Sequence, residues 1–117
     1  SNMTILLVDD DQSGLLTLRI ALSQEGYLVT ATTDSRQALL YLRERRFDVL
    51  VTDNRMAHYG GVDLARLARR LWPGIKTILI SGFTDEQEIA QEQDLKLFKK
   101  PVDVDVLSAY LRSIFTT

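Results

Sequence analysis

Polar residues that could carry out chemistry follow apolar runs at four places in this 117-residue sequence. The four groups are Asp9-Asp10-Asp11 after Val8, Asp53 after Thr52, Ser81-Gly82 after Ile80, and Lys99-Lys100-Pro101 after Phe98. Carboxylates gathered at one place repel one another, and a hard divalent cation such as Mg²⁺ relieves that repulsion. One carboxylate can then attack phosphorus while the metal, a lysine and a hydroxyl neutralise the transferring oxygens. These residue types therefore predict formation of an acyl phosphate, provided that folding brings them together.

The apolar runs before these residues have the length and composition of buried strands, and they alternate with segments of helical period. The expected strands are Thr4–Val8, Tyr27–Ala31, Val49–Thr52, Lys76–Ile80 and Lys96–Phe98. The alternation is typical of βα units around one parallel sheet, whose strands end at a common edge where ligands bind. We therefore expect the four polar groups to converge on one pocket at that edge.

Helical segments lie between the strands and after the last one. The apolar stripes of four of them are Leu15-Leu18-Leu22, Ala38-Leu39-Leu42, Leu64-Leu67-Ala68-Leu71 and Leu107-Leu111-Ile114. Asp34 provides a capping start for the second helix, Trp72-Pro73-Gly74 ends the third, and the last begins after Asp103. A further helix over Thr84–Asp94 has Ile89 and Ala90 as its apolar anchors, so we expect it to be weakly docked.

Length and composition favour one compact domain, which we place at residues 3–117, with 45% hydrophobic residues to form its core. Ser1-Asn2 ahead of Met3 has the form of a remnant of tag removal. The net charge of -2 provides no basic field, so we expect no direct nucleic-acid binding. Because the sequence has neither an apolar run of about 20 residues nor a signal pattern, we expect a cytoplasmic protein that does not enter a membrane.

Each polar group also has a purely structural explanation. Asp9-Asp10-Asp11 could cap the first helix, because aspartate is favoured at helix N-termini. Asp53 could only form a turn, and Ser81-Gly82 and Lys100-Pro101 could simply lead out of their strands. Because four such groups at matching strand ends are an improbable coincidence, we favour the chemical interpretation.

Taken in order, these residues resemble the receiver domain of response regulators in two-component signalling, over nearly the whole chain. The matching segments are Leu7–Asp11, Asp48–Asp53, Met56 with Gly60-Gly61, Ile80–Gly82 and Lys100-Pro101. The resemblance implies an α/β fold with a single doubly wound, flavodoxin-like (βα)5 sheet of five parallel strands in the order 2-1-3-4-5. It also implies a cis peptide bond between Lys100 and Pro101.

The resemblance further implies a role for each site residue. The implied site comprises the phosphoacceptor Asp53, the Mg²⁺ ligands Asp9, Asp10, Asp53 and the Arg55 carbonyl, and the phosphoryl contacts Ser81 and Lys100. The donor would be a phosphohistidine of a sensor histidine kinase or phosphotransfer protein. Phosphorylation would regulate an output domain or partner, including an effector or kinase domain fused outside this chain. Such a domain is no ordinary enzyme, because it catalyses only its own phosphorylation and dephosphorylation.

Three features depart from the usual receiver pattern. Ala57 stands where receivers usually have proline, and Leu97 stands where they usually have the aromatic residue three places before the pocket lysine. Phe98 is one place later, so we expect its side chain on the opposite face of the strand. The stretch between Ser81 and Lys100 is also a few residues shorter than in typical receivers.

Two other functions compete with the phosphoacceptor. The first is a pseudo-receiver, an interaction module that keeps the fold and signals without phosphorylation. The second is an aspartyl-phosphate phosphatase of the haloacid dehalogenase type, since Asp9 and Asp11 form an Asp-x-Asp pair after the first strand. The phosphatase ranks last, because the chain is too short for that family's usual cap domain and Asp53 would have no role.

Overall fold

The computed structural model describes residues 2–82, 89, 92 and 94–115. Five strands are present, β1 (Thr4–Val8), β2 (Leu28–Thr32), β3 (Val49–Asp53), β4 (Lys76–Ser81) and β5 (Leu95–Lys99). The helices bounded within the described residues are α1 (Gln12–Gln24), α2 (Ser35–Glu44), α3 (Gly61–Leu71) and α5 (Val104–Phe115). Most of the further helix predicted over Thr84–Asp94 lies outside the described residues.

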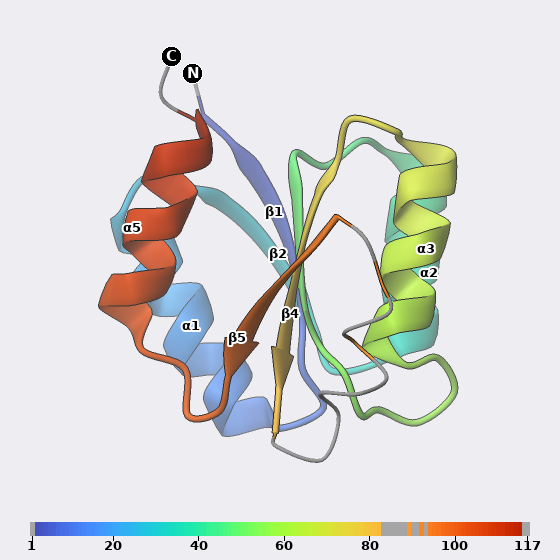
Figure 1. Cartoon of the computed structure of the whole chain (residues 1–117), viewed down its shortest axis with the longest axis horizontal. Coiled ribbons are helices and arrows are strands. Elements are labelled where there is room, and N and C mark those ends of the chain that lie inside the picture. The colour runs from blue at the N-terminus through green and yellow to red at the C-terminus, as the bar shows by residue number, and fades with distance from the viewer. Residues whose placement is uncertain (1, 83–88, 90–91, 93, 116–117) are drawn as a thin grey trace.

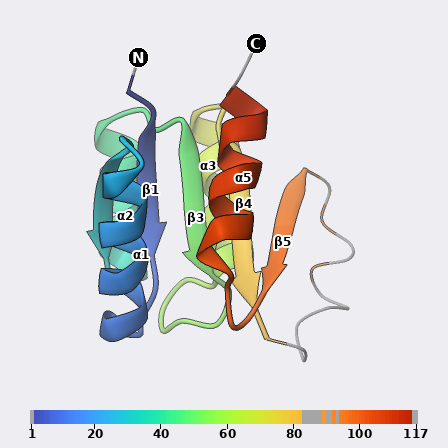
Figure 2. The same ribbon diagram turned by 90° about the vertical axis from the view of Figure 1, so that its left-hand side faces the viewer.

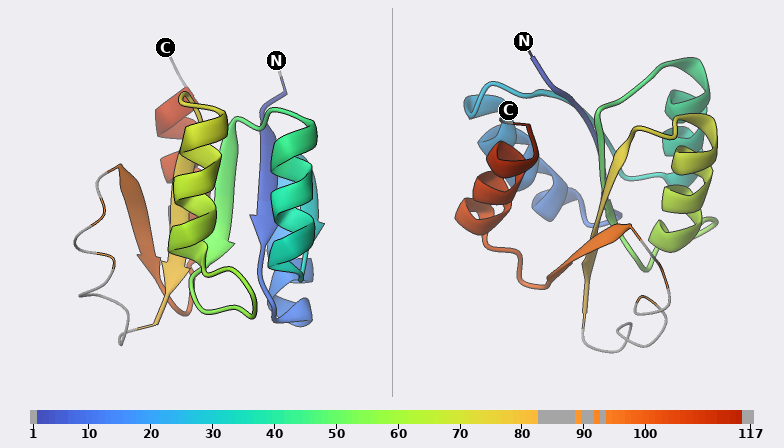
Figure 3. Two further views of the ribbon diagram at one scale, coloured as in Figure 1. Left: turned by 90° about the vertical axis from the view of Figure 1, so that its right-hand side faces the viewer. Right: turned by 45° about the horizontal axis from the view of Figure 1, so that its top comes forward.

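The strands form one parallel sheet in the order β2-β1-β3-β4-β5, which is the predicted flavodoxin-like order. Helices α1 and α5 cover one face of the sheet and α2 and α3 cover the other (Figures 1 and 2). The left view of Figure 3 shows α2 and α3 side by side over the second face. Helices on both faces bury the inner strands from both sides, which explains the nearly continuous apolar runs in the sequence.

None of the helices among the described residues combines the length and the apolar character needed to cross a membrane.

The two faces of the sheet carry separate parts of the core. Alternate β1 residues Ile5 and Leu7 pack toward α1 and α5, whereas Leu6 and Val8 pack toward α2 and α3. The predicted stripes of α1 and α2 are buried as expected, as are Leu107 and Leu111 of α5. The alternation follows from the two-residue period of a strand, which sends successive side chains to opposite faces.

The predicted stripe of α3 is wrong at its last position. Leu71 is 40% exposed, although Leu64 and Ala68 of the same stripe are buried. The next residue, Trp72, packs against the core in its place, and its indole nitrogen donates a hydrogen bond to the Leu42 carbonyl at 2.7 Å. Because Trp72 ends the helix with a non-helical backbone, its ring can turn inward where a further helical residue would not.

The predicted strand ends are one residue short at β2, β3, β4 and β5. Asp53 is the last residue of β3 and Ser81 the last of β4. The Asn54 amide donates to the Ile80 carbonyl at 3.1 Å, and the Lys100 amide donates to the Ser81 carbonyl at 2.8 Å. These bonds continue the ladder past the apolar runs, so Asp53 and Ser81 are held by strand hydrogen bonding.

The side chains of Leu97 and Phe98 point to opposite faces of β5, as predicted. Leu97 packs against the cluster of Val62, Leu79 and Ile89. Phe98 packs on the other face, where its ring meets the Tyr110 ring edge-on with centroids 5.7 Å apart. The aromatic ring of β5 therefore lies against α5.

Gly61 begins α3 directly behind the end of β3. An added Cβ at Gly61 would collide with the Asp53 carbonyl oxygen and would lie 2.7 Å from Leu79 Cδ1. The close approach of the helix to Asp53 therefore requires a residue without a side chain.

We predict that Gly61→Ala lowers the free energy of unfolding by about 1–3 kcal/mol, because the new methyl group forces α3 away from β3. This cost exceeds the gain in helix propensity from alanine, which is at most about 1 kcal/mol. Urea denaturation measures the change. Gly74→Ala is the matched control, since the nearest atom to its Cβ, Arg46 Nη2, is 3.9 Å away. Equal stability of Gly61→Ala and wild type would contradict the prediction.

Candidate functional site

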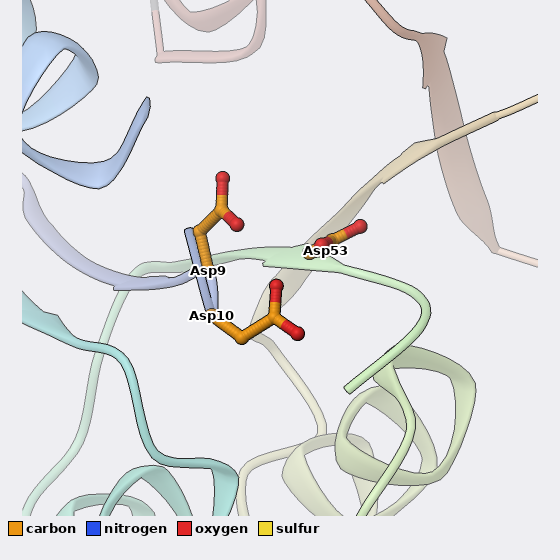
Figure 4. Close-up of side chains that lie close together, drawn as sticks. All are labelled: Asp9, Asp10 and Asp53. Carbon is orange, nitrogen blue, oxygen red and sulfur yellow. The ribbon is translucent and has the colours of Figure 1, made fainter. Parts of the chain in front are cut away.

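Three carboxylates meet at the carboxyl edge of the sheet. Asp9 and Asp10 follow β1, and Asp53 ends the neighbouring strand β3, where Val8 and Thr52 are paired. One oxygen from each carboxylate lies within 4.8 Å of the others, and Figure 4 shows the three side chains close together at the ends of their strands. Asp9 and Asp53 are buried and Asp10 is exposed. The predicted convergence of these residues is confirmed.

The aspartates of the first group differ in their positions and contacts. Asp11 takes the N-cap position of α1, and its carboxylate accepts a hydrogen bond from the Ser13 hydroxyl at 3.2 Å. Asp9 instead accepts a bond from the Asp11 amide at 3.0 Å, which fixes its carboxylate within the turn. Asp11 therefore occupies the N-cap position without a side-chain hydrogen bond to the helix backbone, while Asp9 and Asp10 lie in the cluster with Asp53.

Lys100 brings a positive charge to this cluster. Its ammonium nitrogen lies 3.0 Å from Asp53 Oδ2, and the Asn54 amide donates to Asp53 Oδ1 at 2.8 Å. Lys100 directly follows β5, and the Lys100–Pro101 peptide bond is cis, as the resemblance implied. The lysine side chain is 45% exposed whereas that of Asp53 is 5% exposed. The Lys100 ammonium group therefore reaches a buried carboxylate from the solvent side.

Burial dominates the electrostatics of Asp53. It raises the pKa of the Asp53 carboxyl, an effect that the hydrogen bond and charge of Lys100 oppose and the charge of Asp9 reinforces. Partial burial lowers the pKa of Lys100, but the hydrogen bond to Asp53 and the charges of Asp53, Asp9 and Asp10 outweigh it, so the net shift is upward. Lysine therefore stays charged at neutral pH.

The charge balance of the site favours a further cation. Asp9, Asp10 and Asp53 bring three carboxylates to one place, and the Lys100 ammonium contacts one of them, Asp53. Carboxylate oxygens are the ligands that Mg²⁺ prefers in proteins. The donor set of this cluster therefore fits a hard divalent cation.

The remaining predicted residues lie at the same edge. Ser81 is 1% exposed at the end of β4, next to β3, and its hydroxyl donates to the Gly82 carbonyl at 3.0 Å. Arg55 lies two residues beyond Asp53 with an exposed side chain. The phosphoryl contact of Ser81 and the metal-binding role of the Arg55 carbonyl stay predictions.

Ser35 was missed by the reasoning from sequence, although it holds the loop that leaves Asp53. This buried residue begins α2, and its hydroxyl donates to the Ala57 carbonyl at 2.6 Å. The same hydroxyl accepts a hydrogen bond from the Tyr59 amide at 3.0 Å. The available signal was its place after the N-cap residue Asp34, which predicts a helix start and says nothing of a loop more than twenty residues away.

Comparison with known proteins places the chain in a family. The model of the response regulator receiver domain matches residues 5–112. The transcriptional regulatory protein ZraR of Escherichia coli K12 is 34% identical over 113 residues, which are 94% of this chain and 26% of that protein. The CAI-1 autoinducer sensor kinase/phosphatase CqsS of Vibrio cholerae is 33% identical over 88% of this chain and 16% of that protein. The chain thus spans about a quarter or less of these curated relatives.

Solved structures agree with this family. A response regulator receiver protein from Sinorhizobium medicae superposes with a TM-score of 0.89 at 30% identity, covering 97% of this chain and 94% of that one. A receiver domain protein from Clostridium thermocellum gives a TM-score of 0.87 at 25% identity, covering 95% and 92%. With the sheet order and the family match over residues 5–112, these likenesses show that the chain belongs to the response regulator receiver domain family of two-component systems.

Proposed function

We propose that residues 3–117 form a receiver domain in which Asp53 accepts a phosphoryl group from a phosphohistidine of a sensor histidine kinase or phosphotransfer protein. The observation that carries the proposal is the buried Asp53 carboxylate, held 3.0 Å from the Lys100 ammonium and beside two further carboxylates. The phosphorus–nitrogen bond to the donor imidazole breaks as a phosphorus–oxygen bond to Asp53 forms. The electron pair of the broken bond leaves with the imidazole.

Each residue around Asp53 has a different proposed part in this transfer. The Asn54 amide donates to Oδ1 and fixes the orientation of the carboxylate, while Lys100 contacts Oδ2. The half-exposed lysine side chain can turn toward a phosphoryl oxygen and keeps its charge, because its pKa is raised. The Ser81 hydroxyl, at the end of the adjacent strand, is proposed as a second phosphoryl contact.

The acidic cluster is the proposed magnesium site, with Asp9, Asp10, Asp53 and the Arg55 carbonyl as ligands. Bound Mg²⁺ would supply positive charge that offsets the negative oxygens of the transferring group. We further propose that phosphorylation regulates an output domain or a separate partner, including an effector or kinase domain fused outside this chain. Two similar proteins are named as a transcriptional regulator and a sensor kinase/phosphatase, which agrees with either context.

We predict one phosphoryl adduct, seen by intact mass, when the chain is incubated with Mg²⁺ and acetyl phosphate. Asp53→Asn abolishes the adduct because it removes the attacking carboxylate. Asp63→Asn, which changes an exposed aspartate of α3, is the matched control and keeps the adduct. An adduct on Asp9 would instead favour the phosphatase, and the absence of any adduct, with a kinase donor as well, would favour the phosphorylation-independent interaction module.

Removal of one carboxylate from the cluster should weaken metal binding. We predict that Asp10→Asn lowers the affinity for Mg²⁺ by about ten- to a hundredfold, measured by isothermal titration calorimetry. Asp10 is exposed, so the variant should unfold at nearly the same urea concentration as wild type. Asp63→Asn is again the control. If Asp10→Asn and wild type bind Mg²⁺ equally well, Asp10 is not a ligand.

The Ser35 hydroxyl should matter for the loop that carries Arg55. We predict that Ser35→Ala lowers the free energy of unfolding by about 1–3 kcal/mol, because it removes the hydrogen-bonding partner of the Ala57 carbonyl and the Tyr59 amide. The Tyr59 amide should also exchange faster with solvent in hydrogen-exchange experiments. The exposed Ser23→Ala serves as control. Unchanged exchange at Tyr59 would show that the loop is held by other contacts.

A further inference from the structure

A recess of about 550 Å³ opens beside the acidic cluster, between α1 and the segment that follows β5. Its apolar walls come from Leu18 of α1, Ile80 of β4, and Val102 and Val104 around the start of α5. The volume falls within the range of sites that take small organic ligands. We call this cavity the α1 recess.

Gly14 keeps the α1 recess open. It lies in the first turn of α1 and lines the recess, so a side chain at this position would occupy part of the space. An added Cβ would already lie 3.2 Å from Asp11 Oδ2 and 3.4 Å from Asp9 Oδ2. Gly14 therefore leaves its part of the lining, next to the carboxylates, without a side chain.

The α1 recess adjoins the proposed reaction site. Asp9 and Lys100 line the recess, and both also belong to the group around Asp53. The Lys100 ammonium lies 3.0 Å from Asp53 Oδ2. A phosphoryl group that contacts Lys100 would therefore touch a residue that also lines the recess, which places the recess within reach of a small group bonded to that phosphoryl.

The polar groups of the recess limit what can enter it. The Thr17 hydroxyl donates to the Ser13 carbonyl at 3.0 Å, so its hydrogen is already used within α1. Asp9 and Asp11 put two negative charges in the lining against the positive charge of Lys100, so the balance disfavours an occupant with a carboxylate of its own. An uncharged apolar group gains the most binding free energy in this recess, because its burial removes apolar surface from water and leaves no polar group of its own unpaired.

We propose that the α1 recess receives the apolar acyl group of a small acyl-phosphate donor, so that this chain uses aromatic acyl phosphates in preference to ones with a charged acyl chain. The proposal rests on Asp53 as phosphoacceptor. In transfer from benzoyl phosphate, the bond between phosphorus and the bridging oxygen breaks and a phosphorus–oxygen bond to Asp53 forms. Benzoate leaves with the electron pair, and no further reactant is needed.

Binding can be tested apart from transfer with two stable phosphonates. Benzylphosphonate should shift the amide NMR signals of Thr17, Leu18 and Val102 in the Mg²⁺-containing protein, and methylphosphonate should shift them much less. The affinity for benzylphosphonate should exceed that for methylphosphonate by about tenfold, as expected for burying one small apolar group. Equal affinities, or shifts confined to residues outside the recess, would overturn the proposal.

Phosphoryl transfer provides the second test. For each variant, the rate constant of phosphorylation is measured with benzoyl phosphate and with succinyl phosphate, and the first is divided by the second. Thr17→Leu and Val104→Phe narrow the recess without replacing a carboxylate, and the ratio should fall about tenfold in both. Ser23→Leu, on an exposed part of α1 away from the recess, should keep the wild-type ratio. An unchanged ratio in both narrowed variants would overturn the inference.

Failure of the proposed function looks different from failure of this inference. If neither the acyl phosphates nor a kinase donor modify wild-type Asp53, the phosphoacceptor role fails and the recess loses its proposed ligand with it. If a kinase donor modifies Asp53 but benzoyl phosphate does not, the recess proposal alone is wrong. If acetyl phosphate modifies Asp53 but the phosphonates bind equally and the ratio does not respond to narrowing, the phosphoacceptor role stands and the recess proposal alone is wrong.

Discussion

The burial of the Asp53 carboxylate is the constraint on which the rest of the site depends. A carboxylate with 5% of its side chain exposed, next to other carboxylates, is costly unless positive charge compensates it. Lys100 compensates part of that cost, yet the pKa of Asp53 is still raised by burial. Burial together with the charge of Asp9 therefore outweighs Lys100 in setting the pKa of Asp53, and a cation, or a phosphoryl group with its accompanying cation, would offset negative charge at this place.

Parallel strand register is what assembles these charges from distant parts of the chain. Val8 pairs with Thr52, and Asp53 pairs with Ile80, so the residues that follow or end β1, β3 and β4 come to one edge. Asp53 and Ser81 are themselves the last residues of β3 and β4, so hydrogen bonding within the sheet holds their backbones in place. The close approach of Gly61 to the Asp53 backbone then places the start of α3 directly behind Asp53.

The sequence predicted those parts of the fold and site that follow from local pattern. Apolar runs followed by Asp9, Asp53, Ser81 or Lys100 indicated a common edge, and helical spacing found most of the buried stripes. What it did not reveal depends on contacts between distant segments. The Ser35 hydroxyl binds a loop more than twenty residues away, Trp72 takes the inward place expected for Leu71, and the α1 recess needs α1 and the segment after β5 together.

The two faces of β5 differ in the side chains that they present beside the site. The ring of Phe98 is held against Tyr110, and the Lys96 ammonium lies 5.8 Å and 5.1 Å from the centroids of these two rings. Leu97 faces the opposite cluster and offers no ring that could rotate between polar positions. The Lys100 amide is bonded to the Ser81 carbonyl at 2.8 Å, which ties the backbone at the end of β5 to the end of β4. The position of the lysine beside Asp53 therefore depends on the pairing of these two strands, and the aromatic ring of β5 lies on the face away from Leu97.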